Sequence, residues 1–573
     1  MARKDPVLFA DLIQRELQRS LSLPEKDQWL AGLKLLDVVL TEATAEEALH
    51  FSTPFARVAY VCQRFRLVAP LPYFLHRLRL GADGAYSLAQ WVRICRKALL
   101  HLLEALTGQP AAPALQPLAE APWPEREAEH PIQAFRPFIR VSVQRLDADE
   151  KCLWAVSEEA PESILAIRYD LPDRNAPFTP ILDQLSRWFR LPVTMGLIDV
   201  EVDAQGGLRP AAFVLEPDYL MDVSAIAECF KGAEVVPQSY LLHKFLPRLP
   251  TQPLLLGQVA NFFLDELMGR PGASFRETFP AVFQQQPLGF ALLTDAELRE
   301  LGQKAQRHWM NLNKVLDEDF PQAGIEPEFC YLEPTFFSDR FGLQGRLDVL
   351  YKKGRKSAIV ELKSGKPFMP NAYQISANHF TQTLLYYLLI QSAFGKAVDP
   401  TCYILYSVAG QSPLRYAPRV QAQQREALRV RNELLVLEKQ MQRLGGDRLL
   451  DKADWFFGQL RPDRAPHVKG FTRDHLQQMQ DTYRQLEPVE RKYLAAFTGF
   501  IAREHQLAKT GSPGRHGLAS LWLERAEEKD DQFELLQGLK VIDNQSGAGQ
   551  PRLIFARTEQ TNPLANFREG DLV

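Results

Sequence analysis

The stretch GRLDVLYKKGRKSAIVELKSGKP, residues 345–367, contains two short apolar segments joined by the basic turn KKGRK. Apolar and β-branched residues on both sides of a turn predict a β-hairpin. Side chains alternate faces along a strand, so Glu361 and Lys363 share one face while Val360 and Leu362 point into the core. Pairing of the two strands would then bring Asp348 within a few ångströms of Glu361. The hairpin therefore predicts two carboxylates and a lysine at one place.

Two neighbouring carboxylates repel each other unless a cation lies between them. Oxygen ligands with open positions for water suit Mg²⁺ or Mn²⁺, and such an ion can activate water beside a scissile phosphate. Lys363 could then orient the water or stabilise the charge that develops. A surface hairpin with a Glu361–Lys363 pair is the structural alternative, and the hairpin alone leaves both interpretations open.

A helix is predicted over HFTQTLLYYLL, residues 379–389. His379, Gln382 and Tyr386 stand at positions i, i+3 and i+7 and share one face of it. Leaning over the hairpin, this face could hold Lys363 or a phosphate, although any amphipathic helix shows the same spacing.

The ordered set GLQGRLDVL (342–350), AIVELKSGKP (358–367), HFTQTLLYYLL and CYILYSV (402–408) resembles the RecB-type branch of the PD-(D/E)XK nucleases. The resemblance covers residues 250–410 and is nearest to bacterial relatives of the nuclease-helicases that trim Okazaki-fragment flaps. It implies an α/β fold with several domains, in which helices flank a central mixed sheet of the restriction-endonuclease type. Helical N-terminal and C-terminal regions would be added to this core.

The resemblance also implies roles for individual residues. Asp348 and Glu361 would bind Mg²⁺ or Mn²⁺, with the backbone carbonyl of Leu362 as a further ligand. Lys363 would be the catalytic lysine. Gln382 and Tyr386 would form the family's Q-x-x-x-Y helix and complete the catalytic set. Glu333, in CYLEP, stands where relatives of this branch often carry an additional acidic residue, and it could be a further metal ligand.

Two departures from the family pattern concern metals. Many relatives have a metal-binding His in an upstream G-x-x-H helix, whereas this chain has Gly257 followed by Asn261. Asn261 could ligate through its carbonyl oxygen as a neutral partner, or it could simply be hydrogen-bonded in a buried helix. Flap-processing relatives also often hold an iron-sulfur cluster, and Cys229 could supply its first ligand. Because no cysteine follows Cys402, we expect no iron-sulfur cluster.

The remaining cysteines lie far apart and predict neither a zinc site nor a disulfide framework. They are Cys62, Cys95, Cys152 and Cys330.

The net charge of −3 excludes a protein coated in basic surface but allows local patches. DNA-binding candidates are basic residues in two runs, for which a solvated face is the alternative. The first run is KKGRK, with Lys352, Lys353, Arg355 and Lys356. The second contains Arg415 and Arg419, followed by Arg425, Arg429 and Arg431.

Six regions are expected along the chain, and the clearest boundary is the segment rich in Pro and Ala. They are a helical region (1–108), a linker (109–131), a small β-rich domain (132–235), the nuclease core (236–420), a helical region (421–535) and the start of a β-barrel (536–573). The last region resembles the entry to a helicase motor outside this chain. No P-loop motif occurs, so the motor would belong to a longer chain or to a partner. Neither a signal peptide nor a membrane span is predicted, which indicates the cytoplasm.

The leading hypothesis is a divalent-metal-dependent deoxyribonuclease that cuts single-stranded or flap DNA in repair, replication or end processing. Two alternatives stay open: a DNA-binding or scaffold module with a degenerate nuclease site, and a phage-defence or RNA-directed nuclease. The polarity of cutting, endonuclease or exonuclease preference and the oligomeric state have no signal in the sequence.

Overall fold

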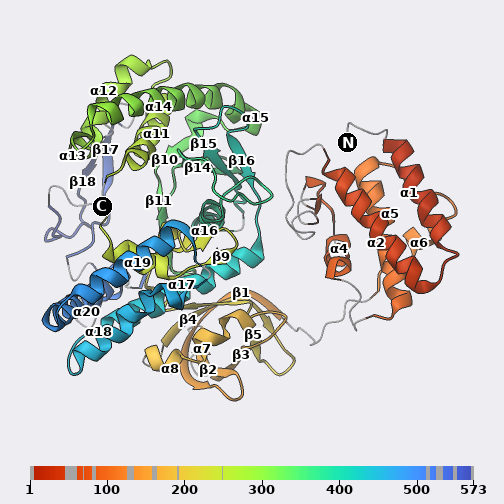
Figure 1. Ribbon diagram of the computed structural model, residues 1–573, viewed down its shortest axis with the longest axis horizontal. Helices are drawn as coiled ribbons and strands as arrows, with labels where there is room; N and C mark the ends of the chain where they lie inside the picture. The colour runs from red at the N-terminus through yellow and green to blue at the C-terminus, as the bar shows by residue number, and fades with distance from the viewer. Residues whose placement is uncertain are drawn as a thin grey trace.

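The computed structural model describes most of the 573-residue chain (Figure 1). The described residues are 6–45, 58, 61–62, 64–68, 70–80, 86–124, 134–157, 164–189, 191, 193–247, 250–395, 397–466, 468–511, 517–523, 529, 533–545 and 552–568. Helices and strands alternate in it, and its sheets combine parallel and antiparallel pairs. The predicted mixed α/β class is confirmed.

The first 124 residues contain a helical bundle with its own hydrophobic core, which Figure 1 shows in red and orange beside the rest of the chain. Its helices are α1 (Pro6–Ser20), α2 (Glu25–Ala43), α4 (Leu71–Leu80), α5 (Leu88–Thr107) and α6 (Gln116–Glu120). Ser87 and Gln90 form a capping box at the start of α5, and Gly108 ends it with a φ of 71°. In the predicted linker, Leu115 is buried in this bundle, and residues 125–131 lie outside the described residues.

A small β-barrel follows the bundle. Its strands are β1 (Ala134–Asp147), β2 (Cys152–Ser157), β3 (Ile164–Arg168), β4 (Val193–Val202), β5 (Leu208–Arg209) and β6 (Ala212–Leu215). β1 pairs with both β2 and β4, while β3 pairs with β5 and β5 with β4, so five strands close on themselves. Three short helical segments connect β3 to β4: η1 (Ala176–Phe178), α7 (Thr179–Leu182) and α8 (Leu185–Trp188). Closure removes the free edges that an open sheet would expose.

A short segment leads from the barrel to the predicted nuclease core. Its elements are β7 (Met221–Asp222), α9 (Val223–Ala227), β8 (Phe230–Lys231), β9 (Glu234–Val235) and α10 (Gln238–Phe245). β7 pairs in parallel with β12 (Leu343–Arg346), which also pairs with β11 (Thr335–Ser338). The segment after the barrel thereby supplies one strand to a sheet of the predicted nuclease core.

The central sheet has five strands in the order β10 (Cys330–Leu332), β13 (Val349–Lys353), β14 (Lys356–Lys363), β15 (Thr401–Tyr406) and β16 (Leu414–Ala417). The predicted hairpin is confirmed, because β13 and β14 pair antiparallel with Lys353 opposite Lys356. Gly354 in the turn between them has a φ of 60°, a conformation that glycine adopts easily. β14 and β15 are parallel and are connected by α16 (Ala377–Phe394).

Helices cover both faces of this sheet (Figure 1). Val360 and Leu362 face α11 (Gln252–Gly269) and α14 (Asp295–Lys314) in one hydrophobic cluster. Ile359 points to the opposite face, toward α16. Glu361 and Lys363 share that face, as the alternation along β14 predicted. The face covered by α11 and α14 also packs against α12 (Phe275–Gln285), α13 (Pro287–Ala291), η2 (Val315–Asp319), α15 (Phe320–Ala323) and η3 (Pro327–Phe329).

The C-terminal region is mostly helical. It comprises α17 (Gln421–Gln442), α18 (Leu449–Phe457), η4 (Gly458–Leu460), η5 (Pro462–Arg464), α19 (Gly470–Gln485), α20 (Pro488–Thr510), α21 (Ser520–Leu523) and the hairpin of β17 (Lys540–Asn544) and β18 (Leu553–Ala556). α17 packs against β6 of the barrel and against α16. None of the described helices is long and apolar enough to cross a membrane.

Arg431 on α17 joins the barrel to the predicted nuclease core. It is fully buried and donates hydrogen bonds to main-chain oxygens on both sides, those of Tyr219 at 2.7 Å, Glu216 at 3.0 Å and Gly342 at 3.3 Å, and also that of Leu215. Arg431 therefore does not belong to the basic surface run in which the sequence placed it.

Candidate active site

A cleft with a volume of about 1240 Å³ opens beside the β13–β14 hairpin. Five of the predicted site residues line it together with Asn261 of α11: Asp348, Glu361, Lys363, Gln382 and Tyr386. Further lining comes from α10, α19 and α20, which contribute His243, Lys244, His475, His505 and Lys509. Residues more than 280 positions apart in the sequence thus share one cavity.

Asp348 stands directly before β13, next to the strand that carries Glu361. Its Oδ2 accepts the main-chain N–H of Leu362 at 2.7 Å. Because this bond belongs to the hairpin itself, strand pairing positions the carboxylate. The Leu362 side chain is buried, and its carbonyl as a metal ligand stays a prediction.

Glu361 lies 3% exposed beneath α16 and is held by two side chains. Its Oε1 accepts the ammonium of Lys363 at 2.9 Å and the amide of Gln382 at 2.6 Å. The carbonyl Oε1 of Gln382 in turn accepts Lys363 at 2.9 Å. The glutamate, lysine and glutamine therefore form a closed triangle of hydrogen bonds.

Tyr386 anchors this triangle to the hairpin. The Gln382 amide donates to its hydroxyl at 3.0 Å, and the hydroxyl donates to the main-chain oxygen of Arg346 at 2.7 Å. The Tyr386 ring lies so close to Gly345 that a Cβ added there would come within 2.8 Å of the ring. Glycine is therefore required at this position for the helix to approach.

Burial and the neighbouring like charge disfavour ionisation of Asp348 beside Glu361. Burial raises the pKa of Asp348 well above its ordinary value, and the neighbouring Glu361 carboxylate adds to the effect. Burial alone would lower the pKa of Lys363, but the carboxylates of Glu361 and Asp348 outweigh it and raise that pKa. Lys363 is therefore a protonated cation between two acids.

The donor set fits a divalent cation. Oε2 of Glu361 is buried and has no hydrogen-bond partner among the described residues, while its other oxygen is fully occupied. A buried carboxylate oxygen without a partner is costly, and a cation beside it would satisfy it. Asp348 and Asn261 supply further oxygen atoms of the kind that Mg²⁺ and Mn²⁺ bind. The described residues contain no group of three His, Cys, Asp or Glu arranged to hold a metal ion, so carbonyl and water ligands would complete the set.

Glu333 is near the site but does not line the cleft. Its carboxylate forms a salt bridge with Arg346 at 3.1 Å, and its main-chain N–H donates to the main-chain carbonyl of Asp348 at 3.0 Å.

Asp265, one helical turn after Asn261, was not singled out from the sequence. Burial raises its pKa to about 6, with a further contribution from the charge of Glu333. Its spacing of four residues from Asn261 on one helix face was the available signal.

Six of the basic residues in the two predicted DNA-binding runs lie elsewhere. None of Lys352, Lys353, Arg355, Lys356, Arg415 and Arg419 lines the cleft. Lys353 pairs with Glu326 at 2.5 Å, while Arg415 and Arg419 lie over the rings of Tyr406 and Tyr387. Their contact with DNA stays a prediction.

A second layer of hydrogen bonds supports Lys363 from behind. Its carbonyl accepts the N–H of Ser407 at 3.0 Å, and the Ser407 hydroxyl lies 2.8 Å from Nδ1 of His308. His308 is buried, which lowers its pKa to about 4 and keeps the ring neutral. The sequence offered no signal for this link between α14 and the end of β15.

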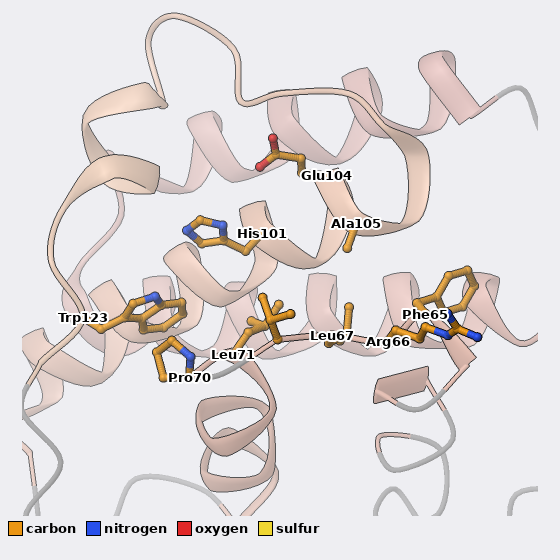
Figure 2. Close-up of a pocket in the computed structure, with 10 residues that line it drawn as sticks. Phe65, Arg66, Leu67, Pro70, Leu71, His101, Glu104, Ala105 and Trp123 are labelled. Atoms are coloured by element: carbon orange, nitrogen blue, oxygen red, sulfur yellow. The ribbon is translucent and has the colours of Figure 1, made fainter. Parts of the chain in front are cut away.

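A smaller hollow of about 340 Å³ lies in the N-terminal bundle. Figure 2 shows His101, Glu104 and Trp123 around it, with Pro70 and Leu71 below. The His101 ring contacts the carbonyl of Ala119 at 3.2 Å. Most of the other lining residues are apolar, and the hollow contains no pair of acids comparable to the cleft.

The match to a family model agrees with this geometry. Residues 258–491 match the family model described as the PD-(D/E)XK nuclease superfamily. Over 137 residues the chain is 31% identical to the DNA replication ATP-dependent helicase/nuclease DNA2 of Xenopus tropicalis, a match that covers 22% of this chain and 12% of the relative. The crystal structure of a protein from Eubacterium rectale assigned as an exonuclease aligns with a TM-score of 0.27 and 14% identity, over 39% of this chain and 81% of that one.

Proposed function

Residues 258–491 form a PD-(D/E)XK nuclease superfamily domain, and from this premise we propose that the chain is a metal-dependent deoxyribonuclease. It would hydrolyse phosphodiester bonds of single-stranded or flap DNA. One observation carries the proposal: the buried Oε2 of Glu361 has no hydrogen-bond partner within the described part of the chain and lies beside a second buried carboxylate, Asp348.

Asp348, Glu361 and the carbonyl of Leu362 would hold Mg²⁺ or Mn²⁺, with Asn261 as a neutral further ligand. When bound, the cation supplies Lewis-acid activation of water and neutralises charge on the phosphate. Glu333, whose charge contributes to the raised pKa of Asp348, would act on that carboxylate rather than on the ion.

Lys363 would present a protonated ammonium to the scissile phosphate, where it stabilises negative charge that develops on the oxygens. Gln382 accepts one ammonium hydrogen and donates to Glu361, so it fixes both groups in one geometry. Tyr386 keeps Gln382 in place through its bond to Arg346. The cleft beyond these residues has room for an extended strand.

The choice of DNA as substrate, and of a helicase as partner, is supported by the similarity to the DNA replication helicase/nuclease of Xenopus tropicalis, of which the chain matches 12%. The motor would be part of a longer chain or a separate protein, acting in repair, replication or end processing. Six free thiols are compatible with a reducing compartment such as the cytoplasm.

Cleavage of a labelled 5′-flap and a plain single strand tests the proposal, with Mg²⁺, Mn²⁺ or EDTA. Wild type should cut only with a divalent ion, and Glu361→Gln, which keeps the side-chain shape, should lose activity by at least about 100-fold. Glu328→Gln, an exposed acid in η3, is the matched control and should cut normally. Cutting in EDTA, or full activity of Glu361→Gln, would refute the proposed site.

A second function, DNA binding without cleavage, is favoured by the neutral Asn261 at the place of the family's histidine. Titration with Mn²⁺ distinguishes the two. A scaffold would bind the strand equally with and without the ion and would not cut. A nuclease should gain thermal stability with Mn²⁺ in wild type but not in Glu361→Gln.

A further inference from the structure

A second pocket, of about 380 Å³, adjoins the cleft at Lys363. Lys363 lines both cavities, so the pocket and the carboxylates share one wall. We call it the lysine pocket. Its lining includes Lys231, Lys363, Lys366, Phe368, Ser376 and His379.

The lining of the lysine pocket is cationic. It contains three lysines and, among the described residues, no aspartate or glutamate. Lys231 pairs with Glu228 at 3.0 Å at the border with the cleft, and Lys363 is engaged by Glu361. Lys366 is exposed and has no ion-pair partner in the part of the chain that the structure describes. Such a cavity attracts an anion.

Neutral polar groups and a helix N-terminus complete the lining. The hydroxyl of Ser376, at the start of α16, accepts the N–H of Phe368 at 2.8 Å instead of capping the helix. Ala377 and Asn378, in the first turn of α16, line the pocket, where the positive end of the helix dipole lies. Burial and the charge of Lys363 lower the pKa of His379 to about 3, so its ring contributes as a neutral group.

An exposed aromatic ring lies at the mouth of the pocket. Phe368 is 70% exposed although its main chain is anchored by Ser376. The neighbouring Met369 packs against Gly232, where an added Cβ would lie 3.5 Å from the Met369 side chain. The loop between β14 and α16 is thus fixed at both residues and presents the ring to solvent. Aromatic rings held in this way stack on unpaired bases.

We propose that the lysine pocket binds a phosphate of the substrate strand next to the scissile one, while Phe368 stacks on a neighbouring base. The proposal rests on the proposed function for the identity of the strand as DNA. The bound phosphate would be either a terminal monoester or an internal diester, and both present the same anionic oxygens. Occupation of the pocket would fix which bond of the strand reaches Asp348 and Glu361.

The test measures binding in EDTA, where cleavage does not occur. Fluorescence anisotropy would follow a labelled single strand with a 5′-phosphate, the same strand with a 5′-hydroxyl, and a circular single strand. The variants are Lys231→Gln and Lys366→Gln. Lys492→Gln, which removes an exposed lysine near the start of α20, is the control of equal charge. Thermal midpoints and circular dichroism would establish that each variant is folded.

Each pocket variant should bind about five- to tenfold more weakly and reduce the slope of log Kd against log salt by about 0.7, the loss of one phosphate contact. Loss confined to the 5′-phosphorylated strand would identify a terminal phosphate, and equal loss on the circular strand an internal one. Variants that match Lys492→Gln within about twofold, or a wild type that binds none of the strands, would overturn the proposal.

Phe368→Ala isolates the stacking step, and Phe368→Leu retains apolar area without a ring. Both should weaken binding, the alanine variant by about tenfold, independently of base sequence and with the salt slope unchanged. Unchanged binding would remove the stacking step. These measurements need no metal, so the pocket and the nuclease are tested separately. If the variants bind more weakly but the wild type never cuts DNA, the pocket is supported and the nuclease is refuted. If the wild type cuts normally and the variants bind as well as wild type, the nuclease is supported and the pocket is refuted.

Discussion

The main-chain N–H of Leu362 donates a 2.7 Å hydrogen bond to Oδ2 of Asp348, so the strand that carries one acid positions the other. The two carboxylates are thereby held close in a buried place where their charges repel. This arrangement is unfavourable for folding and suited to binding a cation.

Asp348→Asn should therefore stabilise the protein in the absence of metal. An amide keeps the acceptor for Leu362 and removes one of two repelling charges, which predicts a gain of about 1 kcal/mol and a melting midpoint a few degrees higher. Differential scanning fluorimetry in EDTA would measure it, with the exposed Asp474→Asn as control. With Mn²⁺ the wild type should gain more than the variant. A midpoint equal to or below that of wild type in EDTA would contradict the prediction.

Gln382→Leu should impair catalysis through position rather than contact with the substrate. Without the amide, Glu361 and Lys363 lose the group that joins them, and kcat should fall by about 10- to 100-fold with little change in KM. The Mn²⁺ concentration at half-maximal activity should rise, which a general structural defect would not produce. The control is Gln391→Leu, which changes another glutamine of the same helix, one whose amide donates to the hydroxyl of Tyr387. Identical behaviour of the two variants would refute a positioning role.

His308 predicts a loss of stability in acid. Its pKa falls from 6.5 to about 4 on folding, so the unfolded chain binds the proton more readily. Stability from the neutral ring is present above pH 6.5 and is lost as the pH falls toward 4, by at most about 3 kcal/mol. Urea unfolding between pH 4 and 7.5 would measure this slope. It should be shallower in His308→Gln than in wild type, and parallel slopes would count against the assignment.

Arg431→Met should destabilise the protein strongly. The substitution removes the buried guanidinium that donates to the carbonyls of Tyr219, Glu216 and Gly342, at a cost of about 3–5 kcal/mol, although the last two carbonyls also accept main-chain N–H groups. Arg448→Met, at a side chain 81% exposed, should change stability by less than about 0.5 kcal/mol. Urea midpoints of the two variants would show the contrast. A small effect at Arg431 would mean that packing alone joins the barrel to α17.

The hairpin and its acids could be predicted because their signals are local. Strand alternation assigned Glu361 and Lys363 to one face, and the short turn fixed the register that brings Asp348 beside them. The helix with Gln382 and Tyr386 added a second local pattern, and the resemblance to a family then assigned roles to both.

The remaining features depend on contacts between distant segments. The cleft wall with His475 and His505 comes from helices more than 100 residues beyond the hairpin. Lys231 reaches the lysine pocket from a two-residue strand with no periodicity of its own. Arg431 looked like part of a basic run, although Ala427, Leu428, Leu434 and Leu435 place it on the apolar face of α17, a signal that could have been read.

The parallel pair of β7 and β12 affects how the chain can be shortened. β12 ends at Arg346, two residues before Asp348, and its outer neighbour β7 comes from residues 221–222, well before the segment that matches the nuclease family. A fragment trimmed to residues 258–491 would leave one edge of β12 without its partner strand and α17 without the barrel it packs against. A minimal recombinant enzyme should therefore retain the barrel, and chimeras made by exchanging the matched segment alone should fold poorly.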